Sequence, residues 1–176
     1  MLKLTDIKFQ GEQMAVAVIY GSAMGNTESA ANIIADKLGI SDVLNIADIN
    51  ADKINSYDNL ICGTSTWGSG DLQDDWDGFD FSGLSLSGKV VAVFGMGDSE
   101  SYSDTYCGGM GKLAQNLKDA GATLVGEVST DGYNFESSDA VVDGKFVGLA
   151  LDNDNQEDQT EARIDAWIAQ IKPQFS

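Results

Sequence analysis

An apolar run that breaks abruptly into a small polar loop, residues 16–28, constrains this chain more than any other stretch. The segment from Val16 to Tyr20 is rich in β-branched residues and predicts a strand, and an amphipathic helix is expected over residues 27–38. A strand, a loop and a helix N-terminus in this order leave several backbone N–H groups without intrahelical partners, all pointing one way. Together with the positive end of the helix dipole, these groups predict a site for a phosphate.

The loop itself contains small residues that suit this role. Ser22, Asn26 and Thr27 can add side-chain hydrogen bonds, and Gly21 and Gly25 permit tight turns. A plainer interpretation is an ordinary helix start, with Asn26 or Thr27 as the N-cap. The loop is not a Walker motif, because no Lys follows Gly25, and its two glycines do not fit the dinucleotide fingerprint.

The charge balance narrows the classes of partner. The 176 residues include 28 acidic and 10 basic side chains, which give a formal net charge of −18. Such a charge argues against nucleic acid and anionic membranes and favours basic protein partners, although solubility alone is a plainer explanation. The chain contains no His, and its two distant cysteines, Cys62 and Cys107, exclude a disulfide framework and a Cys-rich metal site.

The length suits one domain, which we expect over residues 14–176 as a monomer. Residues 1–13 alternate weakly and are expected to form an N-terminal extension, either as an extra edge strand or as a loose arm. No apolar run approaches the length of a membrane span, and the first residues lack a sustained apolar signal region. A cytoplasmic location without membrane insertion is therefore expected.

Strand-like and helix-like segments alternate along the chain. The expected strands are 15–20, 43–46, 59–63, 90–95 and 123–128, and the expected helices are 27–38, 48–56, 109–120 and 160–171. The last strand breaks into a polar, turn-rich stretch before an apolar run resumes at 146–151. This alternation predicts an α/β fold with a central parallel sheet, in which ligands bind at the carboxyl ends of the strands.

Two further loops should share the site with the first. Residues 64–76 follow the third strand and residues 95–108 follow the fourth, and both loops hold an aromatic residue among glycines and small polar residues. Neither loop contains a pair of groups suited to acid–base or nucleophilic catalysis. This composition favours a flat aromatic ligand that stacks on rings and bonds to backbone. Trp76 and Cys62 are expected in the core, whereas Trp67 is either a loop anchor or a ligand contact.

Several motifs, in the right order, resemble the long-chain flavodoxins from about Ala15 to Phe175. They are Tyr20-Gly21-Ser22, Thr66-Trp67 with Gly70-Asp71-Leu72-Gln73, Gly97-Asp98 with Tyr102, Ser129-Thr130-Asp131-Gly132-Tyr133, and the run from Gly144 to Asp152. The resemblance implies a flavodoxin-like three-layer α-β-α sandwich whose five-stranded parallel sheet has the order 2-1-3-4-5. It also implies that the long-chain insertion interrupts the fifth strand, and that the protein holds one noncovalent FMN.

The resemblance also assigns a role to each loop by position. The residues that would wrap the FMN phosphate are Ser22, Ala23, Met24, Gly25, Asn26 and Thr27. Trp67 and Tyr102 would flank the two faces of the isoalloxazine. Its edge would be lined by residues 66–70, which include Thr66, Gly68, Ser69 and Gly70, by Gly97 and Asp98, and by the backbone of Thr105 and Cys107. Ser65 is a further expected cofactor contact. Met24 stands where the family usually has a hydroxyl residue, so one hydrogen bond to the phosphate is expected to be missing.

The implied function is that of an electron carrier, not an enzyme. Such a protein transfers one electron at low potential between redox proteins and is able to replace ferredoxin. The carboxylates expected around the flavin are Asp71, Asp74, Asp75, Asp98 and Asp104. One carboxylate at roughly 10 Å, with an effective dielectric of ~20, opposes the charge of the reduced flavin by about 1.7 kcal/mol, or roughly 70 mV. The partner that the resemblance suggests is a ferredoxin-NADP reductase, with photosystem I, nitrogenase or a pyruvate oxidoreductase as further candidates.

Two other functions occur on this fold and remain alternatives. An FMN-dependent NAD(P)H-quinone reductase needs room over the flavin, which Trp67 and Tyr102 would cover. A phosphoacceptor signalling domain needs an Asp at the end of the third strand, where this chain has Gly63-Thr64-Ser65.

Overall fold

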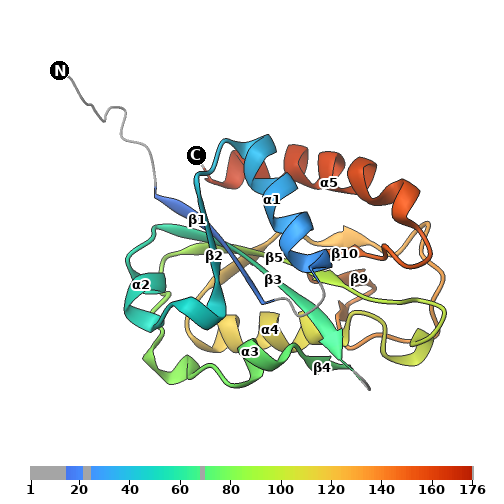
Figure 1. Ribbon diagram of the computed structural model, residues 1–176, viewed down its shortest axis with the longest axis horizontal. Helices are drawn as coiled ribbons and strands as arrows, with labels where there is room; N and C mark the ends of the chain where they lie inside the picture. Colours follow the sequence, from blue (N-terminus) through green and yellow to red (C-terminus); the bar gives the residue numbers. More distant parts are fainter. Residues whose placement is uncertain (1–14, 22–24, 68–69, 176) are drawn as a thin grey trace.

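A parallel sheet forms the centre of the protein. The computed structural model describes residues 15–21, 25–67 and 70–175. The strands follow the order β2-β1-β3-β5, and both β6 and β10 pair with the far side of β5 (Figure 1). They are β1 (Val16–Gly21), β2 (Asp42–Asn45), β3 (Asn59–Trp67), β5 (Val90–Met96), β6 (Thr123–Val125) and β10 (Leu149–Leu151). The expected order 2-1-3-4-5 is confirmed, whereas the extension expected over residues 1–13 lies outside the described residues.

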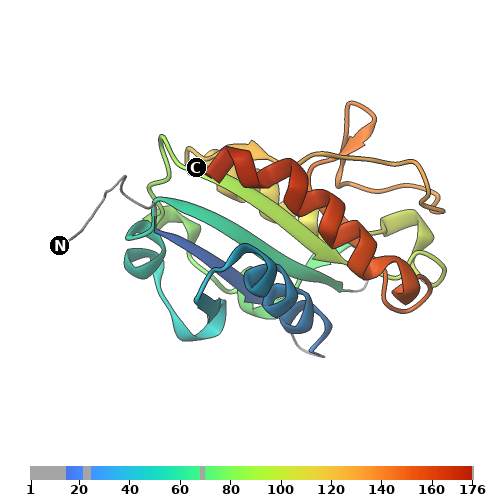
Figure 2. The same ribbon diagram turned by 90° about the horizontal axis from the view of Figure 1, so that it is seen from above.

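Helices cover both faces of the sheet, because its central strands are apolar on both sides. Side chains alternate along β1, so Val18 packs on one face and Ile19 on the other. The helices on the Val18 face, which lie side by side in Figure 2, are α1 (Asn26–Leu38) and α5 (Glu157–Ile171). The opposite face is covered by α4 (Gly108–Asp119) with the shorter α2 (Ala51–Asn55) and α3 (Asp74–Asp77). The fold is therefore the expected three-layer α-β-α sandwich.

The fifth strand position is interrupted, as expected. β6 pairs with residues 90–92 of β5, and β10 pairs with residues 94–96. Between them the chain forms a small antiparallel sheet in the order β7-β9-β8. Its strands are β7 (Val128–Ser129), β8 (Val141–Val142) and β9 (Lys145–Phe146). The chain rejoins the main sheet at Gly148, where a Cβ would lie 2.0 Å from the carbonyl oxygen of Val93, so this crossing requires glycine.

Aromatic packing fixes the insertion, residues 126–148, to the sandwich. The rings of Tyr133 and Phe146 pack against Tyr106, which is fully buried. From α5, the guanidinium of Arg163 lies 3.9 Å from the centroid of the Tyr133 ring and donates a hydrogen bond of 3.0 Å to the carbonyl oxygen of Gly132. The insertion is thus a packed part of the fold.

Side-chain caps explain where the segments around β2 begin and end. β2 ends at Asn45, one residue earlier than expected, because the Asn45 side chain accepts the N–H of Ala47 and starts the 3₁₀ turn η1 (Ile46–Asp48). The helix expected over residues 48–56 is shorter because Asn50, which accepts the N–H of Lys53, is its N-cap. The remaining 3₁₀ turns are η2 (Phe81–Gly83), η3 (Ser103–Thr105) and η4 (Lys172–Phe175).

The predicted core residues are buried. Trp76 has 0% of its surface exposed, and its indole N–H donates a hydrogen bond of 2.8 Å to the carbonyl oxygen of Gly63. Cys62 is also buried, and burial raises the pKa of its thiol to about 12. Within the described ranges, no helix has both the length and the apolar character that crossing a bilayer requires.

Candidate functional site

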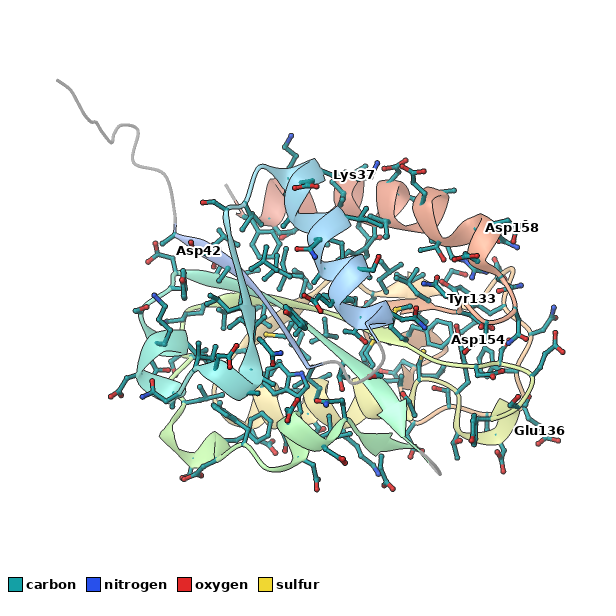
Figure 3. All side chains as sticks on the ribbon, viewed as in Figure 1. Lys37, Asp42, Tyr133, Glu136, Asp154 and Asp158 are labelled. Carbon is teal, nitrogen blue, oxygen red and sulfur yellow. The ribbon has the colours of Figure 1, made fainter. Side chains whose placement is uncertain are left out.

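The carboxyl ends of the central strands are neighbours, so the loops that leave them meet. In the sheet register, Gly63 of β3 pairs with Tyr20 of β1 on one side and with Phe94 of β5 on the other. Asp42 at the start of β2 and Asp154 just after β10 are labelled at opposite ends of the sheet in Figure 3. The loops after β1, β3 and β5 gather at the Asp154 end, where ligands bind in sheets of this type.

A pocket opens between these loops. Its lining residues are Asn26, Thr27, Ser65, Thr66, Met96, Gly97, Asp98, Tyr102, Thr105, Tyr106, Cys107, Asn153 and Asp154. The structure therefore brings together these predicted residues: Asn26, Thr27, Ser65, Thr66, Gly97, Asp98, Tyr102, Thr105 and Cys107. The predicted contacts Gly25 and Gly70 are not among the residues that line the pocket. The predicted contacts Ser22, Ala23, Met24, Gly68 and Ser69 lie outside the described residues, and Trp67 is described through its backbone alone.

Helix α1 directs its amino end to this pocket. Gly25 is the N-cap, with a φ of 91°, and its carbonyl oxygen accepts the N–H of Ser29 at 2.9 Å. The interpretation with Asn26 or Thr27 as N-cap is therefore wrong, because a glycine takes the left-handed turn and both residues lie inside the helix. Thr27 is 1% exposed, and its Oγ1 has no hydrogen-bond partner in the described part of the chain. A buried hydroxyl of this kind destabilises the protein unless something else satisfies it.

The third strand is longer than predicted. β3 continues through Trp67, and the chain turns back as β4 (Asp71–Leu72), which pairs with the end of β3 in the antiparallel direction. The apolar run stops at Gly63, and Thr64, Ser65 and Thr66 continue the strand with polar side chains, of which Thr64 is fully buried. We call residues 64–67 and 70–72 the hairpin arm, and two of its residues, Ser65 and Thr66, line the pocket.

Hydrogen bonds shape the loop after β5. The Asp98 carboxylate accepts the backbone N–H groups of Glu100 at 3.1 Å and Ser101 at 2.9 Å, and the side-chain amide of Asn155 at 2.8 Å. Burial alone would raise the pKa of Asp98, but hydrogen bonds from Ser101, Asn155 and Glu100 outweigh it and hold that pKa below the usual aspartate value. Asp98 is therefore a stable negative charge on the pocket.

The same loop contains an exposed aromatic side chain and a second buried hydroxyl without a hydrogen-bond partner. Tyr102 is 50% exposed, and its N–H donates to the carbonyl oxygen of Asp98 at 3.0 Å. Thr105 Oγ1 is buried and, among the described residues, has no hydrogen-bond partner. Cys107 follows in the left-handed region, with a φ of 53°, and is fully buried. Burial raises the pKa of its thiol to about 12, so the sulfur is not a nucleophilic thiolate at neutral pH.

Four lining residues were not predicted: Met96, Tyr106, Asn153 and Asp154. The latter two follow β10 directly, and β10 is the neighbour of β5. Ligands bind at the carboxyl ends of parallel strands, and this rule located the other loops. It would also have located Asn153 and Asp154 if the apolar run at residues 146–151 had been counted as a strand of the sheet. Partial burial raises the pKa of Asp154, and the carboxylates of Asp98 and Asp152 add to this effect.

The acidic residues expected around the ligand are arranged differently. Within the described chain, Asp98 and Asp154 line the pocket. Asp71 instead forms an ion pair with Lys112, with 3.0 Å between Asp71 Oδ1 and Lys112 Nζ. The Asp75 carboxylate, on helix α3, accepts a hydrogen bond from the side-chain amide of Gln73, which is the N-cap of that helix.

Comparisons with known proteins agree on one family. A family model for flavodoxin matches residues 18–167. A flavodoxin of Nostoc sp. is 43% identical over 165 residues, which cover 91% of this chain and 96% of that relative. Flavodoxin 1 of Escherichia coli is 39% identical over 163 residues, with 90% and 93% coverage. The crystal structure of Fusobacterium nucleatum flavodoxin bound to flavin mononucleotide matches with a TM-score of 0.86 at 30% identity, covering 93% of this chain and 100% of that one. With its interrupted fifth strand and its pocket at the carboxyl ends of the sheet, this chain belongs to the flavodoxin family.

Proposed function

We propose that this protein binds FMN and carries one electron at a time between redox proteins. Among the described residues that line the pocket, Thr27, Thr105 and Tyr106 each have a buried hydroxyl without a hydrogen-bond partner. The two threonine hydroxyls, Thr27 Oγ1 and Thr105 Oγ1, support the proposal most directly. A ligand with several hydrogen-bonding groups would satisfy them, and a structural relative at 30% identity binds flavin mononucleotide.

The described residues fit this cofactor. The N–H groups in the first turn of α1 and the Thr27 hydroxyl would hold the phosphate without a basic side chain. The Thr105 hydroxyl would bind a polar group elsewhere on FMN, and the half-exposed ring of Tyr102 offers a flat face for stacking. When bound, FMN supplies one-electron oxidation and reduction.

Charge supports the low potential and the partners that we propose. Asp98 and Asp154 line the pocket in a chain of net charge −18, so they oppose further negative charge on the cofactor. The same charge would steer basic partners, for which we propose a ferredoxin-NADP reductase. Photosystem I, nitrogenase and a pyruvate oxidoreductase are further candidate partners, and in these roles the protein would replace ferredoxin. We expect reduction by ferredoxin-NADP reductase to slow as ionic strength rises, because salt screens this attraction.

A titration of the FMN-free protein with FMN, followed by flavin fluorescence, tests the proposal. We expect one FMN per chain and a midpoint potential below that of free FMN. Thr27→Val and Thr105→Val should each raise the dissociation constant about tenfold, or about 1.4 kcal/mol. The same substitutions should leave the FMN-free protein equally or more stable, because each removes an unpaired buried hydroxyl. Thr123→Val, on the exposed start of β6, is the matched control.

The possible outcomes separate the alternatives. A wild-type protein that takes up no FMN would overturn the proposal. Unchanged affinity in both threonine variants would leave the carrier function but refute the role of the hydroxyls. Steady NADPH–quinone turnover by the FMN-loaded protein alone would favour the quinone reductase instead.

A further inference from the structure

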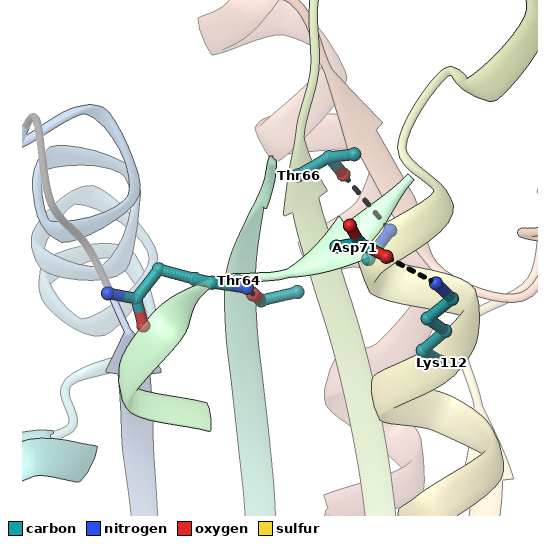
Figure 4. Close-up of polar contacts among 6 residues, drawn as sticks. Thr64, Thr66, Asp71 and Lys112 are labelled. Carbon is teal, nitrogen blue, oxygen red and sulfur yellow. Dashed lines mark hydrogen bonds and ion pairs between the residues drawn. The ribbon is translucent and has the colours of Figure 1, made fainter. Parts of the chain in front are cut away.

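Helix α4 begins without a side-chain cap of its own. Its N-cap is Cys107, whose side chain makes no capping hydrogen bond, and its first two residues are Gly108 and Gly109. The acceptor comes instead from the hairpin arm, where Thr66 Oγ1 accepts the N–H of Gly109 at 3.1 Å (Figure 4). The arm thereby satisfies one of the N–H groups that the start of every helix leaves unpaired.

The glycine pair allows this close approach. A Cβ on Gly108 would lie 2.9 Å from the Cα of Gly70, and a Cβ on Gly109 would lie 2.8 Å from the carbonyl oxygen of Ser65 and 3.0 Å from that of Asp71. All three neighbours are backbone atoms of the hairpin arm, which cannot rotate aside as a side chain does. A larger residue at either position would therefore push the arm and the helix apart.

An ion pair joins the same two elements next to the cap. Lys112 Nζ, in the first turns of α4, lies 3.0 Å from Asp71 Oδ1 at the end of the arm (Figure 4). The side chains are 43% and 67% exposed, so the pair adds little stability by itself. Its contribution is geometric, because with the Thr66 cap it holds the arm to the helix at two separate points.

We propose that the amino end of α4 is a seat that positions the hairpin arm against the FMN pocket, with Gly108, Gly109 and Lys112 as positioning residues. The inference rests on the proposed function, since Ser65 and Thr66 of the arm line that pocket. The three seat residues are not among the described lining residues, so they act on the ligand through the arm. In the FMN-free protein the arm can shift to relieve a contact, whereas in the complex it must fit both the helix and the ligand. A disturbed seat therefore weakens FMN binding more than it weakens the fold.

A comparison of two glycines in the same helix tests this. Gly109→Ala places a methyl group against the arm, whereas Gly111→Ala places one 2.5 Å from the carbonyl oxygen of Asp139 in the insertion. We expect Gly109→Ala to raise the FMN dissociation constant at least about tenfold, or about 1.4 kcal/mol. Gly111→Ala should leave it within about twofold. The melting temperature of the FMN-free protein should fall no further in the first variant than in the second.

A charge swap tests the seat without any steric change at the glycines. Asp71→Lys and Lys112→Asp should each raise the dissociation constant about threefold, and the double variant, which keeps the net charge, should restore it. Thr66→Val should also speed hydrogen exchange of the Gly109 amide in the FMN-free protein, because that N–H loses its acceptor.

Three results would overturn the seat while leaving the proposed function intact: Gly109→Ala binding FMN as the wild type does, both glycine variants binding equally weakly, or a charge swap without rescue. If Gly109→Ala does not fold, the charge swap decides. Failure of the wild-type protein to bind FMN would instead overturn the proposed function itself.

Discussion

Replacing Asp152 should lower the stability of the protein and weaken the attachment of the loop that contains Tyr102. Its carboxylate is 0% exposed and accepts the backbone N–H of Ser99 at 3.2 Å and the Ser99 hydroxyl. Asn155 donates to the same carboxylate through its backbone at 3.1 Å and through its side-chain amide at 3.0 Å, and also to Asp98. One buried carboxylate thus ties the end of β10 to the turn that leads into Tyr102.

The size of the effect follows from these partners. In Asp152→Ala, both Ser99 donors lose their acceptor at a position where Ser99 is 7% exposed. Hydrogen bonds to a charged group contribute about 1.5–3 kcal/mol each, so the two from Ser99 give about 3–6 kcal/mol, with the exposed Asn155 left out. At about 2–4 °C per kcal/mol for a chain of this length, the melting temperature should fall by at least about 6 °C. Asp152→Asn keeps the volume and one acceptor oxygen, so it should lose about half as much.

Urea unfolding of the FMN-free protein measures this directly. Asp131→Ala is the control, because it removes the same charge from an exposed turn and should change the free energy of unfolding by less than about 0.5 kcal/mol. If Asp152→Ala unfolds within about 1 kcal/mol of the wild type, the carboxylate does not hold the loop and the reasoning fails. FMN affinity should fall in the same variant, since the pocket loop loses its anchor.

Further substitutions test other parts of the fold. Trp76→Phe removes the buried hydrogen bond to the carbonyl oxygen of Gly63 and opens space in the core, so urea unfolding should show a loss of about 2–4 kcal/mol. Burial and a hydrogen bond to Asp42 raise the pKa of Tyr57 from 10.0 to about 12. Its neutral phenol therefore stabilises the fold below pH 10, and this contribution is lost as the pH rises to 12; Tyr57→Phe should flatten the stability curve in that window. Arg163→Met removes the cation 3.9 Å from a tyrosine ring of the insertion, and thermal unfolding should report a loss of about 1–2 kcal/mol.

The strands and helices were predictable where apolar residues form either a continuous run or a stripe with helical periodicity. β1 and β5 are apolar on both faces, and α1 carries one buried stripe that ends at Gly39, so each signal lies within a few consecutive residues. Prediction failed where polar residues continue a strand. The end of β3 was missed because Thr64, Ser65 and Thr66 are polar, although Thr64 and Ser65 still pair with β5 and Thr66 pairs with β4.

The part of the candidate site that lies directly after the predicted strands could be located from the sequence. The loops after β1, β3 and β5 were located because carboxyl ends of parallel strands meet at one edge. Asn153 and Asp154 were missed because they follow β10. The insertion separates β10 in sequence from β6, the other strand that pairs with the same side of β5.

The sequence by itself determined the alternating elements, and family motifs predicted the strand order, because both are written in short, periodic or contiguous patterns. Tertiary structure alone decided which polar groups lack partners, such as the hydroxyls of Thr27 and Thr105 within the described chain. It also decided that Gly109 lies against Ser65, far away in the chain. Burial and close contact between distant residues depend on how whole layers pack, and no local pattern records that packing.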